Sequence, residues 1–142
     1  MTSNTTTDIQ MQSCTQAFAD KSENSFADAF ADNVTLEPSV LVRPIKGRDC
    51  VKSVMAAASN AYEALTFTRQ VESAQQTYLE WDAEAFGGQP LSGVTILIKN
   101  PEDLIVHIAI HHRPLGAVIR FSSKLRERLK GKIKPDYFYE GK

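Results

Sequence analysis

Residues 76–113, QTYLEWDAEAFGGQPLSGVTILIKNPEDLIVHIAIHHR, alternate apolar and polar side chains over most of their length. An alternation with a period of two predicts β-strands. Two short segments interrupt it, Gly87–Pro90 and Asn100–Asp103, and their composition predicts turns between antiparallel strands. The expected strands are 77–85, 92–99 and 104–112.

Helical periodicity lies on both sides of this region. Apolar residues three or four positions apart predict helices from Ile9 to Phe18, from Ser25 (as a cap) to Phe30, and from Arg48 to Tyr62. After Arg113-Pro114 the same spacing predicts a C-terminal helix. Its apolar side would consist of Val118, Phe121, Leu125 and Leu129.

Shorter strands complete the pattern. We expect strands at Val34–Glu37 and Val40–Val42, a turn at 43–47, and the start of a long strand at Leu65, Phe67 and Val71. Helices at one end and a meandering sheet at the other predict an α+β domain. The expected organisation is a disordered N-terminus at 1–8, one domain at 9–131 and an extended tail at 132–142.

Composition limits the class of protein. The chain has 142 residues, of which 42% are hydrophobic and 23% charged, as in a globular domain. No apolar run approaches the roughly 20 residues of a membrane span, and the polar opening MTSNTTTD does not resemble a secretory signal. We therefore expect a cytoplasmic protein without membrane attachment. Cys14 and Cys50 form no metal motif and no disulfide framework.

Charge is distributed unevenly. The net charge is −1, but residues 113–142 contain nine Lys and Arg against three Asp and Glu. A basic helix can bind nucleic acid, but aromatic residues are not interleaved with these bases as in RNA-binding surfaces. We expect a solvated helix face and no nucleic-acid partner.

Two segments carry a family resemblance. Residues 26–49, FADAFADNVTLEPSVLVRPIKGRD, resemble the helix–strand–turn–helix opening of the nuclear transport factor two-like superfamily. Residues 81–115, WDAEAFGGQPLSGVTILIKNPEDLIVHIAIHHRPL, look like the closing strands of its SnoaL-like and ketosteroid-isomerase-like members. The resemblance implies a cone-shaped, cystatin-like α+β barrel. In that fold N-terminal helices pack on a strongly curved, mainly antiparallel mixed sheet around an apolar pocket, and a C-terminal helix follows. It also implies a homodimer formed through the outer sheet face.

The resemblance does not imply a standard isomerase. Such an enzyme needs a carboxylate base together with a tyrosine and an aspartic acid that stabilise an enolate oxygen. The tyrosine position falls on Cys14 and the aspartic acid position on Thr95. The base position falls on Pro38, or on Glu37 if one gap is allowed. We expect no ketosteroid isomerase activity.

An epoxide-hydrolase-like site fits no better. Asp82 lies near one of the two aspartates of such a site, but Glu80 stands where its arginine is expected, and the last strand has no aspartate. Glu80, Asp82 and Glu84 share one strand face, which is typical of the solvated side.

The last strand holds all three histidines. One face carries Val106, Ile108, Ile110 and His112, and the other carries Ile105, His107, Ala109 and His111. The first face predicts His112 at the pocket mouth, as an acid or base or as a strand-end cap. His107 and His111 have no third ligand, so we expect no metal and no cofactor.

The pocket is therefore expected to bind a hydrophobic or polycyclic small molecule. An enzyme of isomerase, cyclase, dehydratase or hydrolase type would use Glu37 and His112 as the candidates for proton transfer. Placing Thr95 inward follows the resemblance, because alternation alone favours Val94, Ile96 and Ile98. The alternative function is a non-catalytic dimeric scaffold or ligand carrier, in which the pocket is core. The residues expected to line the pocket are Cys14, Phe18, Leu36, Met55, Trp81, Thr95, Leu97, Ile108, Ile110 and His112.

Overall fold

The computed structural model describes residues 23–139. The helix expected at 9–18, with Cys14 and Phe18, lies outside these residues. The structure contains α2 (Glu23–Ala29), β1 (Phe30–Pro38), β2 (Ile45–Lys46), α3 (Arg48–Ala61), β3 (Ala64–Ser73), β4 (Gln76–Ala85), β5 (Gln89–Lys99), β6 (Ile105–Arg113), α4 (Leu115–Arg128) and the 3₁₀ helix η1 (Pro135–Tyr137). Within residues 23–139, no helix combines the length and the apolar character that crossing a bilayer requires.

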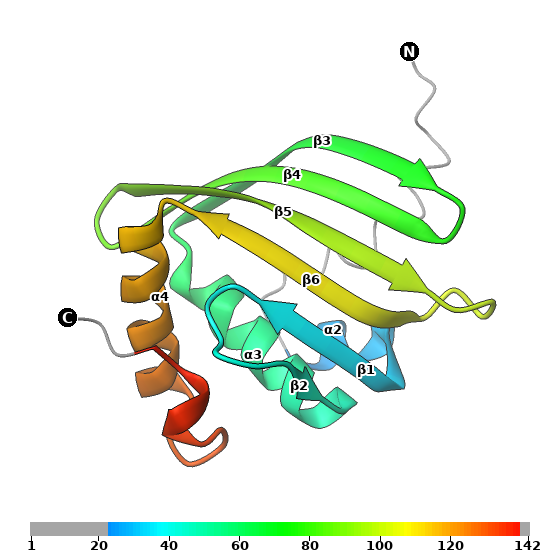
Figure 1. The fold of residues 1–142 in the computed structure, drawn as a ribbon, viewed down its shortest axis with the longest axis horizontal. Helices are drawn as coiled ribbons and strands as arrows, with labels where there is room; N and C mark the ends of the chain where they lie inside the picture. Colours follow the sequence, from blue (N-terminus) through cyan, green and yellow to red (C-terminus); the bar gives the residue numbers. More distant parts are fainter. Residues whose placement is uncertain (1–22, 140–142) are drawn as a thin grey trace.

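The strands form one mixed sheet in the order β2-β1-β6-β5-β4-β3. Its pairs are antiparallel except for β1 and β6, which run parallel. The long strands bend strongly, and the helices lie against the concave side and one end of the sheet (Figure 1). The expected α+β fold, with helices packed on a curved and mainly antiparallel sheet, is confirmed.

The core lies between the sheet and helices α3 and α4. In β4, side chains from Thr77 to Ala85 alternate between buried and more exposed, as the sequence pattern predicts. Helix α3 covers them with Val51 and Met55, and α4 adds Phe121 and Leu125. The apolar faces of the two helices thus bury every second residue of the strand.

The first short elements differ from the prediction. Helix α2 begins at Glu23, so Ser25 lies inside the helix and does not cap it, and Phe30 already belongs to β1. The segment Val40–Val42 makes an isolated bridge from Leu41 to Phe138 instead of a strand, while Ile45–Lys46, expected to turn, pairs with β1.

Two irregularities shift side chains between the faces of the sheet. A register shift between Phe67 and Arg69 leaves Val71 51% exposed, although it was expected beside Phe67. A second shift, near the start of β6, buries Ile105, which the alternation assigned to the outer face. A bulge adds one residue and so reverses the phase of the residues beyond it.

The C-terminal segment folds back on the loop that follows β1. Phe138 is buried, and the Val42 N–H donates to the Tyr137 carbonyl at 2.8 Å. Buried Ser122 of α4 donates its hydroxyl to the Val40 carbonyl at 2.6 Å and accepts the Tyr139 N–H at 2.9 Å. One hydroxyl therefore joins the helix, the loop and the C-terminal segment.

Replacing Ser122 with Ala should lower the free energy of unfolding by about 1–3 kcal/mol, because two backbone groups lose their partner. Urea unfolding should show a lower midpoint at an unchanged slope. The neighbouring Ser123→Ala is the matched control and should change stability by less than about 0.5 kcal/mol. Equal midpoints for the two variants would contradict this account of Ser122.

Candidate functional site

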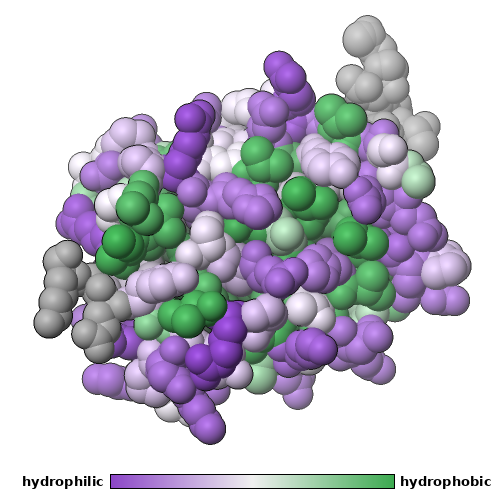
Figure 2. Space-filling view, in the orientation of Figure 1, coloured by the Kyte–Doolittle hydropathy of each residue, from purple (hydrophilic) through white to green (hydrophobic). Residues whose placement is uncertain are grey.

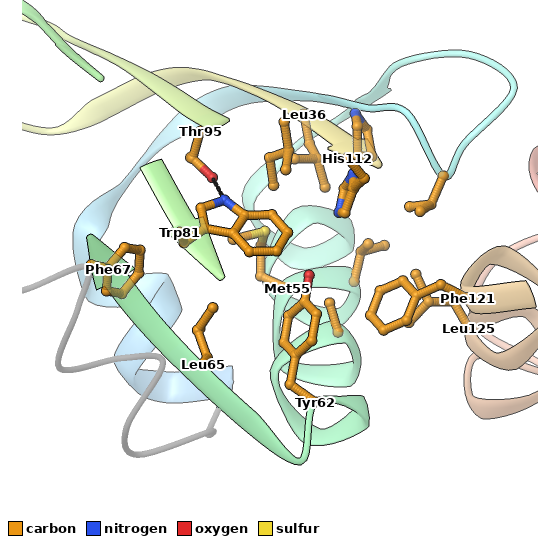
Figure 3. Close-up of a pocket in the computed structure, with 15 residues that line it drawn as sticks. Leu36, Met55, Tyr62, Leu65, Phe67, Trp81, Thr95, His112, Phe121 and Leu125 are labelled. Atoms are coloured by element: carbon orange, nitrogen blue, oxygen red, sulfur yellow. Dashed lines mark hydrogen bonds between the residues drawn. The ribbon is translucent and has the colours of Figure 1, made fainter. Parts of the chain in front are cut away.

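An apolar cavity lies between the concave face of the sheet and helices α3 and α4. Its volume is about 20 Å³, which admits roughly one water-sized group. The side chains that line it come from seven elements and two loops, and Figure 3 shows them converging on it. The lining residues are Leu36, Pro38, Val40, Val54, Met55, Ala58, Tyr62, Leu65, Phe67, Trp81, Thr95, Ile110, His112, Phe121 and Leu125.

A cross-strand row positions the two main groups of the cavity. Trp81 of β4 pairs with Gly93 of β5, and Gly93 pairs with His112 of β6, so all three lie on one face. A Cβ atom on Gly93 would come within 2.5 Å of the Trp81 ring carbon Cζ2. Because glycine leaves this space free, the indole reaches His112, with ring centroids 5.4 Å apart in an edge contact.

Aromatic rings form most of the wall around this row. Tyr62 stacks on Phe121, with ring centroids 5.0 Å apart, and meets Trp81 edge-on at 5.7 Å. The indole N–H of Trp81 donates to Thr95 Oγ1 at 3.0 Å, which satisfies a buried donor. The rings are therefore fixed by packing and the indole also by a hydrogen bond.

The Tyr62 hydroxyl projects into the cavity. Tyr62 is 6% exposed, and burial raises the pKa of its phenol well above the ordinary value, so the group is a neutral donor. Among residues 23–139 this hydroxyl has no hydrogen-bond partner. Figure 3 shows it directed into the space beside Trp81 and His112.

His112 is held by Ser39 from the loop after β1. Its Nδ1 lies 2.8 Å from Ser39 Oγ, and its backbone N–H donates to the same oxygen at 2.9 Å. Burial, with a smaller contribution from the charge of neighbouring His111, lowers the pKa of His112 to about 4. The imidazole is therefore neutral near pH 7. Its Nε2 has no partner in the part of the chain that the structure describes.

The structure places the expected pocket residues in three groups. Leu97 and Ile108 are buried on the same sheet face but do not line the cavity. Cys14 and Phe18 fall outside the described residues. Those that line the cavity are Leu36, Met55, Trp81, Thr95, Ile110 and His112.

The placement of Glu37 in the pocket is wrong. Leu36 and Pro38 of β1 point inward, so the residue between them points outward. The Glu37 side chain is 48% exposed, and its Oε1 lies 2.8 Å from His107 Nε2 on the outer face. Glu37 therefore cannot transfer a proton inside the cavity.

Sequence reasoning missed Tyr62 and Ser39 as site residues. Tyr62 was assigned to the apolar stripe of α3, yet it follows the last helical residue and turns its hydroxyl inward. Ser39 follows Pro38 in an irregular loop, where no periodicity indicates a direction. Phe121 was expected on the apolar side of the last helix, and that side faces the cavity.

The outer face is polar at the β3–β4 side. Glu80, Asp82 and Glu84 are exposed there, and Glu80 lies 3.8 Å from the Arg69 guanidinium. Two open grooves of about 550 and 360 Å³ run past Asp82 and Arg113. Within residues 23–139, no group of three or more His, Cys, Asp or Glu side chains could hold a metal ion.

Neither a protein-family model nor a curated protein matches the sequence. Solved structures do match its fold. An uncharacterized protein with a cystatin-like fold from Silicibacter pomeroyi DSS-3 is 20% identical at a TM-score of 0.79, covering 87% of this chain and 85% of that one. A steroid delta-isomerase from Pseudomonas aeruginosa is 17% identical at a TM-score of 0.78, covering 85% and 89%.

A third match is an NTF-2 like protein of unknown function from Burkholderia xenovorans LB400. It is 16% identical at a TM-score of 0.63, covering 72% of this chain and 79% of that one. At these identities the likeness concerns the fold. The chain has the cystatin-like, nuclear transport factor two-like fold, which the two sequence segments predicted.

Proposed function

We propose that this domain binds a small, mainly apolar molecule in the cavity between the sheet and helices α3 and α4. One observation carries the proposal. Tyr62 Oη and His112 Nε2 face an otherwise apolar cavity, and neither has a partner within residues 23–139. Both atoms are therefore available to a ligand as hydrogen-bonding groups, and an interior that served only as core would need neither of them.

Ligand entry requires a wall to move, because the cavity admits only about one water-sized group. The movable wall in this proposal is β3. Among residues 23–139 it is the edge strand of the sheet and pairs only with β4. Its cavity-lining residues Leu65 and Phe67 are half-buried, so displacing them costs less apolar burial than displacing Trp81 or Met55.

His112 is the group that would carry acid–base chemistry in this cavity. A neutral imidazole can accept a proton, and Glu37 is on the other face. A standard ketosteroid isomerase reaction has no support from these side chains. Thr95, at the expected aspartic acid position, accepts the indole N–H of Trp81.

A second candidate function is the non-catalytic scaffold, and the small cavity volume favours it. Trp81, Phe67 and Met55 all line this small space. In both cases we propose a cytoplasmic homodimer formed through the outer sheet face. Hydrophobic side chains lie among polar ones over the middle of the face in view (Figure 2). The hydrophobic residues of the outer sheet face are the half-buried Tyr78, Val94, Ile96, Ile98, Val106 and Ala109.

The cavity can be tested with the intrinsic fluorescence of Trp81, the only tryptophan of the chain. Toluene, cyclohexanone and 1-octanol should change its emission in a saturable way. Ala58→Leu, which fills the cavity, should weaken binding at least about tenfold, since the ligand and the new side chain compete for space. Ala57→Leu, one residue away and not lining the cavity, is the control. An emission that none of the three compounds changes would favour the scaffold.

The dimer can be tested by light scattering at micromolar concentration. The wild-type chain should have the mass of two copies, and Ile96→Lys should give a monomer because it places a charge between Tyr78 and Ala109 on the outer face. Val42→Lys, at an exposed position in the loop after β1, should leave the dimer intact. A monomeric wild-type protein would refute the dimer.

Acid stability should depend on His112. Its folded-state pKa of about 4 lies below the ordinary value of 6.5, so the unfolded chain binds the proton more tightly. The contribution to stability is complete above pH 6.5 and is lost as the pH falls towards 4. Between pH 7 and pH 4, His112→Gln should lose less stability than the wild type by on the order of 1–3 kcal/mol. His111→Gln is the control, and equal pH profiles for all three proteins would show that His112 is not the group responsible.

A further inference from the structure

Ser39 Oγ lies among three groups at hydrogen-bond distance. They are the His112 backbone N–H at 2.9 Å, His112 Nδ1 at 2.8 Å and the Ile110 carbonyl at 3.2 Å. A serine hydroxyl has one proton to donate and two lone pairs. The N–H occupies one lone pair, so the single proton goes either to Nδ1 or to the Ile110 carbonyl.

Each choice fixes a different tautomer of the neutral imidazole. If Ser39 donates to Nδ1, then the ring proton is on Nε2, and Nε2 is a donor. If Ser39 donates to the Ile110 carbonyl, then Nδ1–H donates to Ser39 Oγ, and Nε2 is an acceptor. A rotation of one hydroxyl thus changes what His112 presents to the cavity, without any change of charge.

Tyr62 lies on the same aromatic wall as His112. Both rings contact Trp81 and Phe121, with centroids 5.7 and 5.0 Å away for Tyr62 and 5.4 and 6.1 Å away for His112. In Figure 3 the Tyr62 hydroxyl and the His112 ring point into the same space. The cavity there admits about one oxygen-sized group.

We propose that Ser39 sets the tautomer of His112, and that His112 Nε2 and the Tyr62 hydroxyl together bind one oxygen atom of the ligand, a carbonyl or a hydroxyl. This inference rests on the proposed function and specifies its ligand class. A carbonyl oxygen accepts from both Tyr62 and Nε2–H. A hydroxyl accepts from Tyr62 and donates to Nε2, so it selects the opposite orientation of Ser39.

Charged ligands do not suit the site. The described lining contains no Lys or Arg, so a carboxylate or phosphate would lose its hydration without gaining an ion pair. A cationic ligand would find no carboxylate there either, because Glu37 lies on the opposite face. The polar group of the ligand is therefore a neutral oxygen.

The test is NMR of the full chain with ¹⁵N-labelled histidine near pH 7, using acetone and 2-propanol as probes of the same carbon skeleton. Shifts of the cavity methyl groups of Met55 and Ile110 report binding, and the ring ¹⁵N shifts of His112 report its tautomer. Acetone should move His112 towards the Nε2–H form, and 2-propanol towards the Nδ1–H form.

Matched variants separate the role of Tyr62 in binding the ligand oxygen from the role of Ser39 in setting the tautomer of His112. Tyr62→Phe should weaken binding of both probes about three- to tenfold, whereas Tyr78→Phe on the outer face should not. Ser39→Ala should reduce the difference in tautomer between the two probes, because Nδ1 loses the hydroxyl that can either donate to it or accept from it, whereas Ser92→Ala should preserve the difference. If Ser39→Ala fails to fold, then the tautomer of His112 in the wild type with the two probes tests the inference.

The outcomes distinguish the two proposals. If neither probe shifts the cavity methyl groups of the wild type, then the proposed function fails and this inference fails with it. If the probes bind but leave His112 in one and the same tautomer, then the inference alone is refuted. It is refuted equally if both probes bind Tyr62→Phe as tightly as the wild type.

Discussion

The interior depends on the register that sets Trp81, Gly93 and His112 side by side on three neighbouring strands. Gly93 matters because it lacks a side chain, and the Trp81 indole occupies the space that a Cβ atom would need. With the indole there, its edge meets His112 and its N–H reaches Thr95. A shift of one residue in β5 would turn Thr95 outward and put a larger side chain beneath the indole.

The loop after β1 provides Ser39 and part of the cavity wall. A second set of interactions holds this loop in place. Its Val40 carbonyl is held by Ser122 of α4, and its Val42 N–H is held by the Tyr137 carbonyl of the C-terminal segment. An irregular loop can orient an imidazole only if its own backbone is fixed. The C-terminal residues thus support the site although none of them was expected to contribute to it.

The sequence predicts regular elements well and the direction of individual side chains poorly. Alternation in β4 follows from burial on one face and water on the other, so the inward position of Trp81 could be read directly. In β5 both sets of side chains are apolar, and only the family resemblance indicated Thr95. Glu37 was misplaced because the family resemblance reached it only by a one-residue gap from Pro38, and one residue of offset reverses the face of a strand. The bulges that expose Val71 and bury Ile105 leave no signal in composition.

Two hydrogen-bonding atoms in the cavity distinguish ligand binding from a filled core better than the cavity volume does. A cavity of about 20 Å³ is within what cores of ordinary domains contain, so its size taken alone favours the scaffold. Hydrogen-bonding groups are different, because a group without a protein partner is available to pair with a ligand. Among residues 23–139 the Tyr62 hydroxyl is such a group, and so is Nε2 of the half-buried His112. Because both groups face the same small space, one oxygen atom can satisfy them together. That arrangement favours a polar occupant over a purely structural interior.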